Sequence, residues 1–202
     1  MTTSNISIPK LRVPDDSILK RGMDIAASSI LLLMFLPLFV FVAALIKLDS
    51  DGPALFRQER IGKDGEPFEI WKFRSMRVGA HPYARSPVGD RDPRLTRIGR
   101  TLRRLSIDEL PQLLNVLKGE MSLVGPRPEM PFIVETYGPL EMQRLSVRPG
   151  ITGLWQISPA RAMPIHENLN YDLSYIANQT IVLDCLILLR TIRAVIRGIG
   201  AA

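Results

Sequence analysis

Apolar residues form one unbroken segment near the N-terminus. From Ile25 to Ile46 the chain runs for 22 residues without a charged side chain, and only two serines and Pro37 fall outside the apolar set. As a straight helix this segment would measure about 33 Å, enough to cross a bilayer core of about 30 Å. A secretory signal peptide fits poorly, because the segment starts late and no Ala-x-Ala-like cleavage site follows it.

Pro37 lies near the middle of this segment and leaves its topology open. A proline inside a helix removes a backbone hydrogen bond and bends the helix. Basic residues flank both ends, Lys20 and Arg21 before and Lys47 after, so the charges give no orientation. Three arrangements fit: a spanning helix that tolerates the proline, a re-entrant helix bent at Pro37, and a buried helix of a soluble protein. These features alone favour the spanning helix.

The remaining chain has the apolar content of one soluble domain, and we expect residues 1–17 to form a polar tail. Strand-like stretches over 54–60 and 67–76 predict a small hairpin. Residues 79–93, rich in proline and glycine, predict an irregular loop. Helical patterns are predicted over residues 95–104, 106–118, 130–137, 139–145, 166–176 and 181–199. The fold class is therefore α+β and mainly helical.

Two of the predicted helices are amphipathic. Over 106–118, four leucines recur at the spacing of one helix face, and Gly119 is typical of a helix end. Over 181–199, arginines alternate with leucine and isoleucine, a pattern that suits a helix in the membrane interface. Packing against the domain with a solvated arginine face fits that pattern equally well.

Composition excludes several classes of protein. The chain has 202 residues, of which 46% are apolar, so a disordered protein is excluded. Cys185 is the only cysteine, which rules out a disulfide scaffold and a cysteine zinc site, and two histidines make a histidine site improbable. The net charge of +6 suggests an anionic partner, such as nucleic acid, anionic lipid or a phosphorylated substrate.

Most of this charge lies in one short stretch. Six arginines and a single acidic residue, Asp92, occur between Arg91 and Arg104, and five of the arginines recur at every third position. A helix would gather most of them on one broad face, and guanidinium groups suit phosphate oxygens. A nucleic-acid interface would be expected to add exposed aromatic rings, and residues 84–131 contain none. We therefore do not expect nucleic acid as the partner.

Two acidic residues follow this stretch directly. In Ser106-Ile107-Asp108-Glu109 the spacing from Ser106 to Glu109 is that of a capping box at a helix N-terminus. The local sequence pattern by itself favours this interpretation. The same position also suits chemistry, because a helix N-terminus attracts anions. A carboxylate placed there could attack phosphorus or hold a divalent cation.

Several longer blocks now match one family in order, over roughly residues 18–200. They are Lys20-Arg21-Gly22-Met23-Asp24, Lys72-Phe73-Arg74-Ser75-Met76, Asp92-Pro93-Arg94-Leu95-Thr96-Arg97-Ile98-Gly99, the block Leu105 to Pro128 with its Asp108-Glu109-Leu110-Pro111 and Gly125-Pro126-Arg127-Pro128 ends, and Arg148-Pro149-Gly150-Ile151-Thr152-Gly153-Leu154-Trp155-Gln156. The chain resembles the small monotopic phosphoglycosyl transferases of the bacterial sugar transferase family.

The resemblance implies a reaction and a location. A sugar-1-phosphate passes from a nucleotide diphosphate sugar, with UDP as the expected nucleotide, to polyprenyl (undecaprenyl) phosphate through a covalent phosphosugar intermediate, with Mg²⁺. The implied location is the cytoplasmic face of the bacterial inner membrane, in contact with phospholipids. The resemblance also implies that residues 18–47 form a re-entrant helix broken at Pro37, against the preference stated above, and that residues 48–202 form the catalytic domain.

The resemblance also assigns roles to residues. It implies that Asp108 is the nucleophile, that Glu109 is its metal-binding partner, and that Arg103 contacts phosphate. It offers Lys72, Arg127 and Arg148 as weaker substrate-binding candidates, for which a salt bridge that holds the fold is an equal alternative.

One turn departs from the family pattern. Residues 158–162 read Ser-Pro-Ala-Arg-Ala where a Gly-Arg-Asn-like turn is common, which leaves the sugar open. The main alternative to an enzyme is a non-catalytic membrane-associated scaffold with a basic face that binds phosphate or nucleic acid, in which Asp108 and Glu109 only cap a helix.

Overall fold

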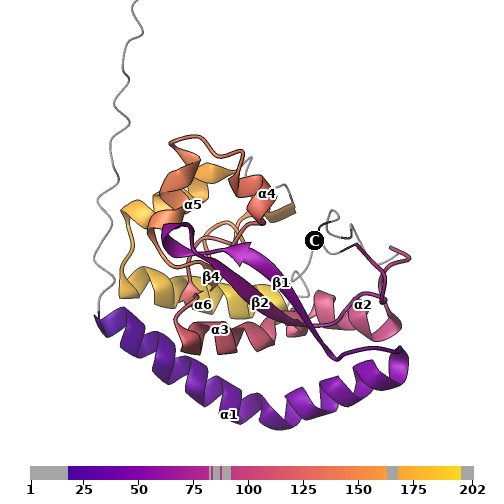
Figure 1. Cartoon of the computed structure of the whole chain (residues 1–202). Coiled ribbons are helices and arrows are strands. Elements are labelled where there is room, and N and C mark those ends of the chain that lie inside the picture. The colour runs from indigo at the N-terminus through magenta and orange to yellow at the C-terminus, as the bar shows by residue number, and fades with distance from the viewer. Residues whose placement is uncertain (1–17, 82, 84–86, 88–91, 163–167, 197–202) are drawn as a thin grey trace, which may run out of the picture.

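The computed structural model describes residues 18–81, 83, 87, 92–162 and 168–196, so the predicted polar tail lies outside the described residues. The chain is a mixed helix and sheet protein in which a small domain lies against one long helix (Figure 1). Its helices and strands are α1 (Ile18–Asp49), β1 (Leu55–Ile61), β2 (Pro67–Phe73), α2 (Arg97–Arg104), α3 (Leu113–Lys118), β3 (Ser122–Val124), α4 (Pro131–Val134), β4 (Gly150–Thr152), α5 (Leu169–Ala177) and α6 (Ile181–Ile196). Four short 3-10 helices are η1 (Lys63–Gly65), η2 (Ile107–Gln112), η3 (Glu141–Ser146) and η4 (Pro159–Ala162).

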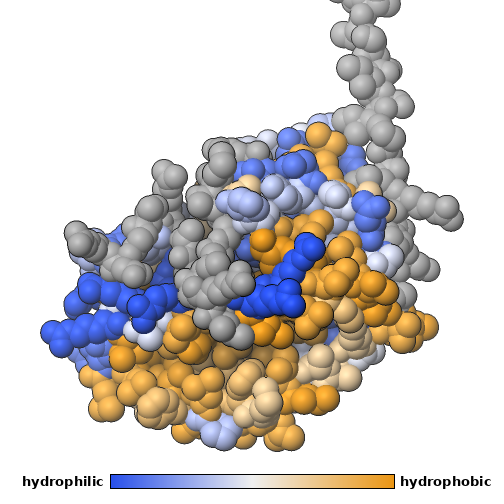
Figure 2. Space-filling view, turned by 180° about the vertical axis from the view of Figure 1, so that it is seen from behind, coloured by the Kyte–Doolittle hydropathy of each residue, from blue (hydrophilic) through white to orange (hydrophobic). Residues whose placement is uncertain are grey.

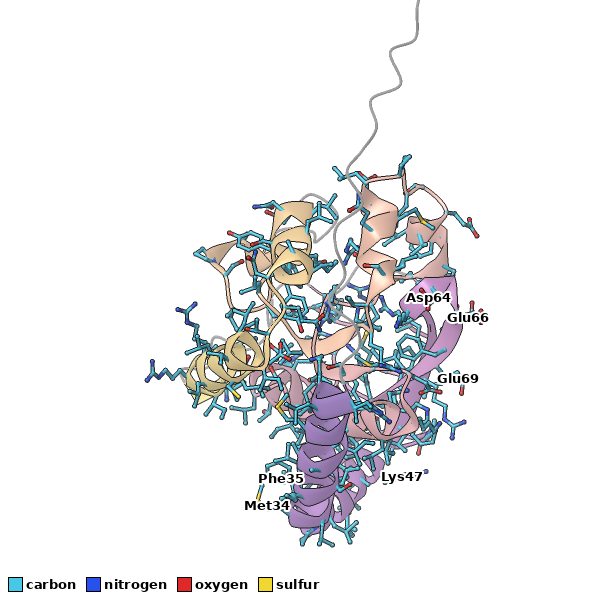
Figure 3. All side chains as sticks on the ribbon, turned by 90° about the vertical axis from the view of Figure 1, so that its left-hand side faces the viewer. Met34, Phe35, Lys47, Asp64, Glu66 and Glu69 are labelled. Atoms are coloured by element: carbon cyan, nitrogen blue, oxygen red, sulfur yellow. The ribbon has the colours of Figure 1, made fainter. Side chains whose placement is uncertain are left out.

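The helix α1 continues through Pro37 and bends in its middle (Figure 1). Its 32 residues include a window with a mean hydropathy of 2.9, of which only 11% is buried, so by length and composition it could cross a membrane. Figure 3 shows Met34 and Phe35 at the far end of the bend, away from Asp64 and Glu66 of the hairpin turn. The bend is therefore the part of α1 that projects from the domain.

Both halves of α1 pack against the same domain. Before Pro37, Ala27, Leu31 and Leu32 contact a core that contains Val116, Met121 and Tyr175. After Pro37, Val42 and Ile46 form a second core with Phe73 and Leu102. Of the three arrangements that the sequence left open, the buried helix of a soluble protein is wrong, because most of the outer face of α1 is exposed and apolar.

A polar stripe attaches the first half of α1. Lys20, Asp24 and Ser28 recur at every fourth position and are buried, as expected for one helix face. Lys20 forms a 2.6 Å ion pair with the buried Asp184 of α6, and Asp24 accepts a hydrogen bond from the amide of Leu123. Polar contacts therefore fix α1 to β3 and α6.

The second half of α1 is attached through its C-terminal end. Arg74, which follows β2, donates to the carbonyl oxygens of Ser50 and Asp51. The Asp49 carboxylate accepts a hydrogen bond from the amide of Ile98 at the start of α2, with 3.1 Å between N and O. Both ends of α1 are therefore bound to one domain.

The predicted hairpin is confirmed, whereas a second pair of strands was not predicted. β1 and β2 pair antiparallel, with Leu55 opposite Phe73 and Ile61 opposite Pro67. β3 and β4 pair in parallel over three residues each, and the sequence contains no local signal for them. Gly125, directly after β3, lies close to the backbone that leads into β4. A Cβ atom at this position would lie 2.5 Å from the carbonyl oxygen of Arg148. The absence of a side chain thus permits this pairing.

The helix predicted over 106–118 is divided in two. Residues Ile107–Gln112 form the 3-10 helix η2, which contains Pro111, and the α-helix α3 begins only at Leu113. α3 ends at Gly119 in the left-handed conformation, as its sequence predicts. The predicted helices over 130–137 and 139–145 are reduced to α4 and η3, and that over 166–176 begins at Leu169, with residues 166 and 167 outside the described residues.

α6 packs against the domain with one face and exposes apolar side chains on the other, so its place in the membrane interface stays a prediction. Asp184 and Ile187 are buried against the domain, while Val182, Leu186 and Leu189 are exposed. Figure 2 shows apolar side chains covering the lower part of the molecule, with hydrophilic ones above them. The exposed apolar faces of α1 and α6 support association of this protein with a membrane.

Candidate active site

The acidic pair lies where a reversal of the chain directs it into the domain. α2 ends at Arg104, and Ser106 then adopts the left-handed conformation with a φ angle of 54°. η2 follows directly, so Asp108 is buried with 5% exposure while the side chain of Glu109 retains 20%. The acidic pair therefore lies inside the domain, one carboxyl fully covered and its neighbour partly so.

The capping-box interpretation is wrong. The side chain of Ser106 makes no capping hydrogen bond, and Glu109 directs its carboxylate elsewhere. The left-handed backbone at Ser106 differs from the extended conformation that a capping serine adopts. η2 is also a short 3-10 helix and not the start of an α-helix. A purely structural role for these carboxylates as a helix cap therefore has no support.

Glu109 is held by two cations from distant parts of the chain. Its Oε1 atom lies 2.8 Å from Lys72 Nζ on β2 and 3.1 Å from Arg127 Nη2 in the turn after β3. Burial alone would raise the pKa of Glu109, but these two positive charges outweigh it and hold that pKa well below its usual range. Glu109 is therefore ionised at neutral pH.

Asp108 has the opposite environment. Burial, together with the negative charge of Glu109, raises the pKa of Asp108 to about 6. The positive charges of Lys72 and Arg103 offset only part of this rise. Adjacent carboxyl groups whose pKa values are driven apart are typical of active sites, because each can then take a separate role.

Arg103 lies partly buried in the last turn of α2, and its charge acts on Asp108. The other arginines of α2 are exposed at the three- to four-residue spacing of one helix face, as predicted, whereas Arg94 precedes the helix and pairs with Asp92 at 2.6 Å. Arg91 lies outside the described residues. The structure thus brings Arg103, and not the whole arginine stretch, to the acidic pair.

The turn that carries Arg127 is supported by a buried network that the sequence did not reveal. Arg144 donates from Nη2 to the carbonyl oxygen of Arg127 and from Nε to Asp172, at 3.0 Å and 2.7 Å. Arg144 is 3% exposed and Asp172 is 2% exposed. These two residues therefore fix the backbone from which Arg127 reaches Glu109.

Arg60 is a further cation beside the site, and the sequence did not predict it. It lies on β1, and its Nη1 atom donates to the carbonyl oxygen of Pro128 at 3.3 Å. No sequence pattern singled it out, because its proximity to Arg127 arises from a bridge between Ile61 and Glu129, far apart in the chain.

Arg148 does not join this cluster among the contacts that the structure describes. Its Nε atom donates to the carbonyl oxygen of Gly119, at the C-terminal end of α3 and the opposite end from η2. That contact supports the helix end, which agrees with the structural alternative for Arg148, and its role in binding substrate stays a prediction.

The carboxylates at this site could hold a single Mg²⁺ only if phosphate oxygens of a substrate completed its coordination shell. No group of three acidic, histidine or cysteine side chains with metal-binding geometry occurs among the described residues. Glu109 Oε1 is bound by Lys72 and Arg127, whereas no contact of its second oxygen is found among the described residues. Mg²⁺ commonly uses one or two carboxylates and completes its shell with water and phosphate oxygens. Glu109, with Asp108 beside it, fits that pattern.

The acidic pair is adjacent to the membrane-facing helix. Ile107, the residue before Asp108, packs on the core formed by the second half of α1. The second half of α1 is therefore in contact with the segment that carries Asp108.

Comparison with known proteins agrees with the motifs. The family model for bacterial sugar transferases matches residues 15–198. The chain belongs to the bacterial sugar transferase family. It is 44% identical over 194 residues to the UDP-N-acetylgalactosamine-undecaprenyl-phosphate N-acetylgalactosaminephosphotransferase of Aeromonas hydrophila, covering 93% of this chain and 46% of that one.

Two further relatives differ in length. The chain is 37% identical over 203 residues to the exopolysaccharide production protein ExoY of Rhizobium meliloti, covering 93% of this chain and 90% of that one. It is 41% identical over 183 residues to the UDP-glucose:undecaprenyl-phosphate glucose-1-phosphate transferase of Escherichia coli, covering 87% of this chain and 39% of that one. The chain thus spans less than half the length of some relatives and nearly all of others.

The turn that departs from the family pattern is only partly described. Ser158 ends a turn in which its hydroxyl donates to the carbonyl oxygen of Trp155, and η4 follows. The side chain of Arg161 lies outside the described residues, so the role of this turn in sugar choice stays a prediction.

Proposed function

We propose that this protein transfers a sugar-1-phosphate from a nucleotide diphosphate sugar, with UDP as the expected nucleotide, to undecaprenyl phosphate. The carrying observation is the buried Asp108 beside the ionised Glu109, with Lys72 and Arg127 bound to the latter. The printed names of the Aeromonas hydrophila and Escherichia coli relatives support both substrates.

The proposed chemistry has two displacements at one phosphorus atom. A carboxylate oxygen of Asp108 attacks the phosphorus that bears the sugar, and the bond from that phosphorus to the bridging oxygen breaks. The nucleoside monophosphate leaves with the electron pair, and an acyl phosphosugar remains on Asp108. A phosphate oxygen of undecaprenyl phosphate then attacks the same phosphorus and releases the carboxylate. An ionised aspartate needs no general base for the first step.

The surrounding residues position and neutralise charge. Phosphoryl transfer depends mainly on these two effects, because the transition state spreads negative charge over oxygen atoms. Arg103 and Arg127 offer guanidinium groups to phosphate, while Lys72 keeps Glu109 ionised. We propose that Glu109 holds Mg²⁺, which would supply further neutralisation of the diphosphate when bound.

We also propose that α1 is re-entrant and that the protein works on the cytoplasmic face of the bacterial inner membrane. What supports this is that both ends of α1 are bound to the same domain, through Lys20 at one end and Asp49 at the other. A straight spanning helix would place one of those ends across the bilayer from its partners. The bend at Pro37 instead allows the exposed apolar middle to enter the bilayer while the site remains in contact with a soluble donor.

Trapping tests the covalent step. The protein is incubated in membranes or detergent with Mg²⁺ and a panel of UDP-sugars, without lipid acceptor, and release of nucleoside monophosphate is measured. With the correct donor we expect about one equivalent of nucleotide per protein and a phosphosugar mass on the Asp108 peptide. Addition of undecaprenyl phosphate should then discharge the peptide and allow continuous turnover.

The control is Asp108→Asn, which removes the nucleophile but preserves size. We expect it to fold with an unchanged Tm or a higher one, because the wild-type carboxyl is costly to ionise in its buried position. A variant that kept full transferase activity would show that Asp108 is not the nucleophile. Absence of nucleotide release from every donor, even with acceptor present, would contradict the proposed function itself.

A further inference from the structure

Arg60 approaches the acidic site from β1 and is oriented by two hydrogen bonds. Its Nη2 atom donates to Gln58 Oε1 at 2.7 Å, and its Nη1 atom donates to the carbonyl oxygen of Pro128. Next along the chain, the amide of Ile61 donates to the carbonyl oxygen of Glu129 at 3.0 Å. The end of β1 is thus joined to the turn that carries Arg127.

The guanidinium of Arg60 has unused binding capacity. Its Nε atom is buried and has no hydrogen-bond partner among the described residues. Among the described residues no carboxylate lies within ion-pair distance of this guanidinium. The carboxylate of Glu129 pairs with Arg144 instead, at 4.0 Å. Burial and the charge of Arg127 lower the pKa of Arg60 to about 10, which still leaves it protonated at neutral pH. Burying a charged guanidinium without a paired anion costs folding free energy, and an anion bound beside Arg60 would offset that cost.

The side chains around Glu109 carry more positive than negative charge, which favours the binding of an anion. Lys72, Arg127 and Arg60 converge from three separate elements, and Glu109 is the one carboxylate paired with any of them in the described structure. With Arg103 added to the cations, and with Asp108 and the buried Glu129 both counted as ionised, one positive charge remains in excess. A diphosphate carries the complementary charge and presents oxygen atoms in the geometry that guanidinium groups bind.

We propose that Arg60 binds the diphosphate of the nucleotide sugar together with Arg127. Gln58 and the carbonyl of Pro128 hold the guanidinium in place before the substrate arrives, so Arg60 is preorganised. This inference rests on the proposed function, because it assigns the diphosphate to the same site. It adds to that function a binding residue outside the family blocks that identified the chain.

Binding of phosphate compounds separates this role from catalysis. The probes are UDP, inorganic pyrophosphate and uridine, titrated against the full-length protein with Mg²⁺ present. For Arg60→Gln we expect UDP and pyrophosphate to bind about 10- to 100-fold more weakly, as for loss of a charge-assisted hydrogen bond. Uridine, which has no phosphate, should bind both proteins equally. Unchanged binding of UDP and pyrophosphate by a folded Arg60→Gln protein would overturn the inference.

Arg57→Gln is the matched control on the same strand. Arg57 faces away from the site, where it lies over the ring of Trp71 and 3.7 Å from Glu69. We expect this variant to bind all three probes like the wild type. Arg60→Lys, which keeps the charge but loses the planar fork, should fall between wild type and Arg60→Gln. Equal losses in Arg57→Gln and Arg60→Gln would indicate a general charge effect and contradict the assignment.

A measurement on the unmodified protein covers the case in which both Arg60 variants fail to fold. Phenylglyoxal labels accessible arginines, and peptide masses report which ones react. Pyrophosphate should protect Arg60 and Arg127 together while leaving Arg57 reactive. Protection of Arg127 without Arg60 would overturn the inference.

Kinetics distinguish failure of this inference from failure of the proposed function. In Arg60→Gln we expect KM for the donor to rise about 10- to 100-fold, with KM for undecaprenyl phosphate nearly unchanged. A normal donor KM in Arg60→Gln, with an active wild type and an inactive Asp108→Asn, would reject the role of Arg60 alone. An inactive wild type would reject the function that both proposals share.

Discussion

Lys72 Nζ lies 2.8 Å from Glu109 Oε1, and Arg127 Nη2 approaches the same oxygen at 3.1 Å. The first cation comes from a strand of the hairpin and the second from a turn 55 positions later in the chain. Because both charges act on Glu109, its proton is lost well below neutral pH, whereas Asp108 beside it has a pKa of about 6. Two neighbouring carboxyl groups thus acquire different chemistry from their surroundings.

Neutralising Glu109 should impair the reaction more than the fold. In Glu109→Gln we expect transfer to fall about 10²-fold or more and to respond more weakly to added Mg²⁺, because a charged ligand is lost. Stability should fall by about 1–3 kcal/mol, since Lys72 and Arg127 then face each other without a counter-ion. Initial rates over a Mg²⁺ titration and chemical denaturation measure the two effects.

The matched control for that variant is Glu59→Gln on the exposed side of β1. It removes the same charge away from the site and should leave both the rate and the Mg²⁺ response unchanged. An unaltered Mg²⁺ response in Glu109→Gln would contradict the metal-binding assignment.

The raised pKa of Asp108 predicts the pH dependence of the donor half-reaction. The attacking carboxylate must be ionised, so the single-turnover rate should fall about tenfold per pH unit below a pH of about 6. A bound cation favours the ionised form, so more Mg²⁺ should move the inflection to lower pH. Rapid-quench measurement of nucleotide release at several Mg²⁺ concentrations tests this. A rate that is flat between about pH 5 and pH 7 at low Mg²⁺ would contradict it.

Arg148 and Arg103 should separate stability from activity. Arg148→Gln removes the bond to the Gly119 carbonyl, so we expect a loss of about 1–3 kcal/mol in the free energy of unfolding and a nearly normal KM for the donor. Arg103→Gln should show the reverse, with weakened phosphate binding and an almost unchanged Tm. Denaturation and steady-state kinetics on both proteins check this pair. A raised donor KM in Arg148→Gln at unchanged stability would restore its implied role in binding substrate.

The two ends of α1 should be accessible from the same side of the membrane. Cys185 is exposed and is first replaced by serine. Cysteines placed at Ile18 and Leu48, which are 92% and 85% exposed, should both react with a membrane-impermeant maleimide added from one side. A cysteine at Met34, which Figure 3 shows at the bend, should resist it, because the re-entrant proposal places that residue in lipid. Reaction of the two ends from opposite sides would establish a spanning helix instead.

Much of the architecture could be predicted because it depends on local spacing. The apolar segment with Pro37, the β1–β2 hairpin, the Gly119 helix end and the adjacency of Asp108 and Glu109 all follow from residues close together in the chain. The pairing of β3 with β4 could not, because two strands of three residues carry too little pattern.

The sequence by itself determined that a carboxylate pair follows an arginine-rich stretch and that one helix is apolar enough for a membrane. Only the tertiary structure decided what surrounds that pair. Ser106-x-x-Glu109 has the spacing of a cap, yet Glu109 binds Lys72 and Arg127 instead, because those cations lie within reach only after β2 and the turn after β3 have packed around η2. The same holds for Arg60, whose position beside Arg127 depends on a single bridge between distant segments. Local patterns report on neighbours in the chain, whereas burial and charge pairing depend on residues that only packing brings together.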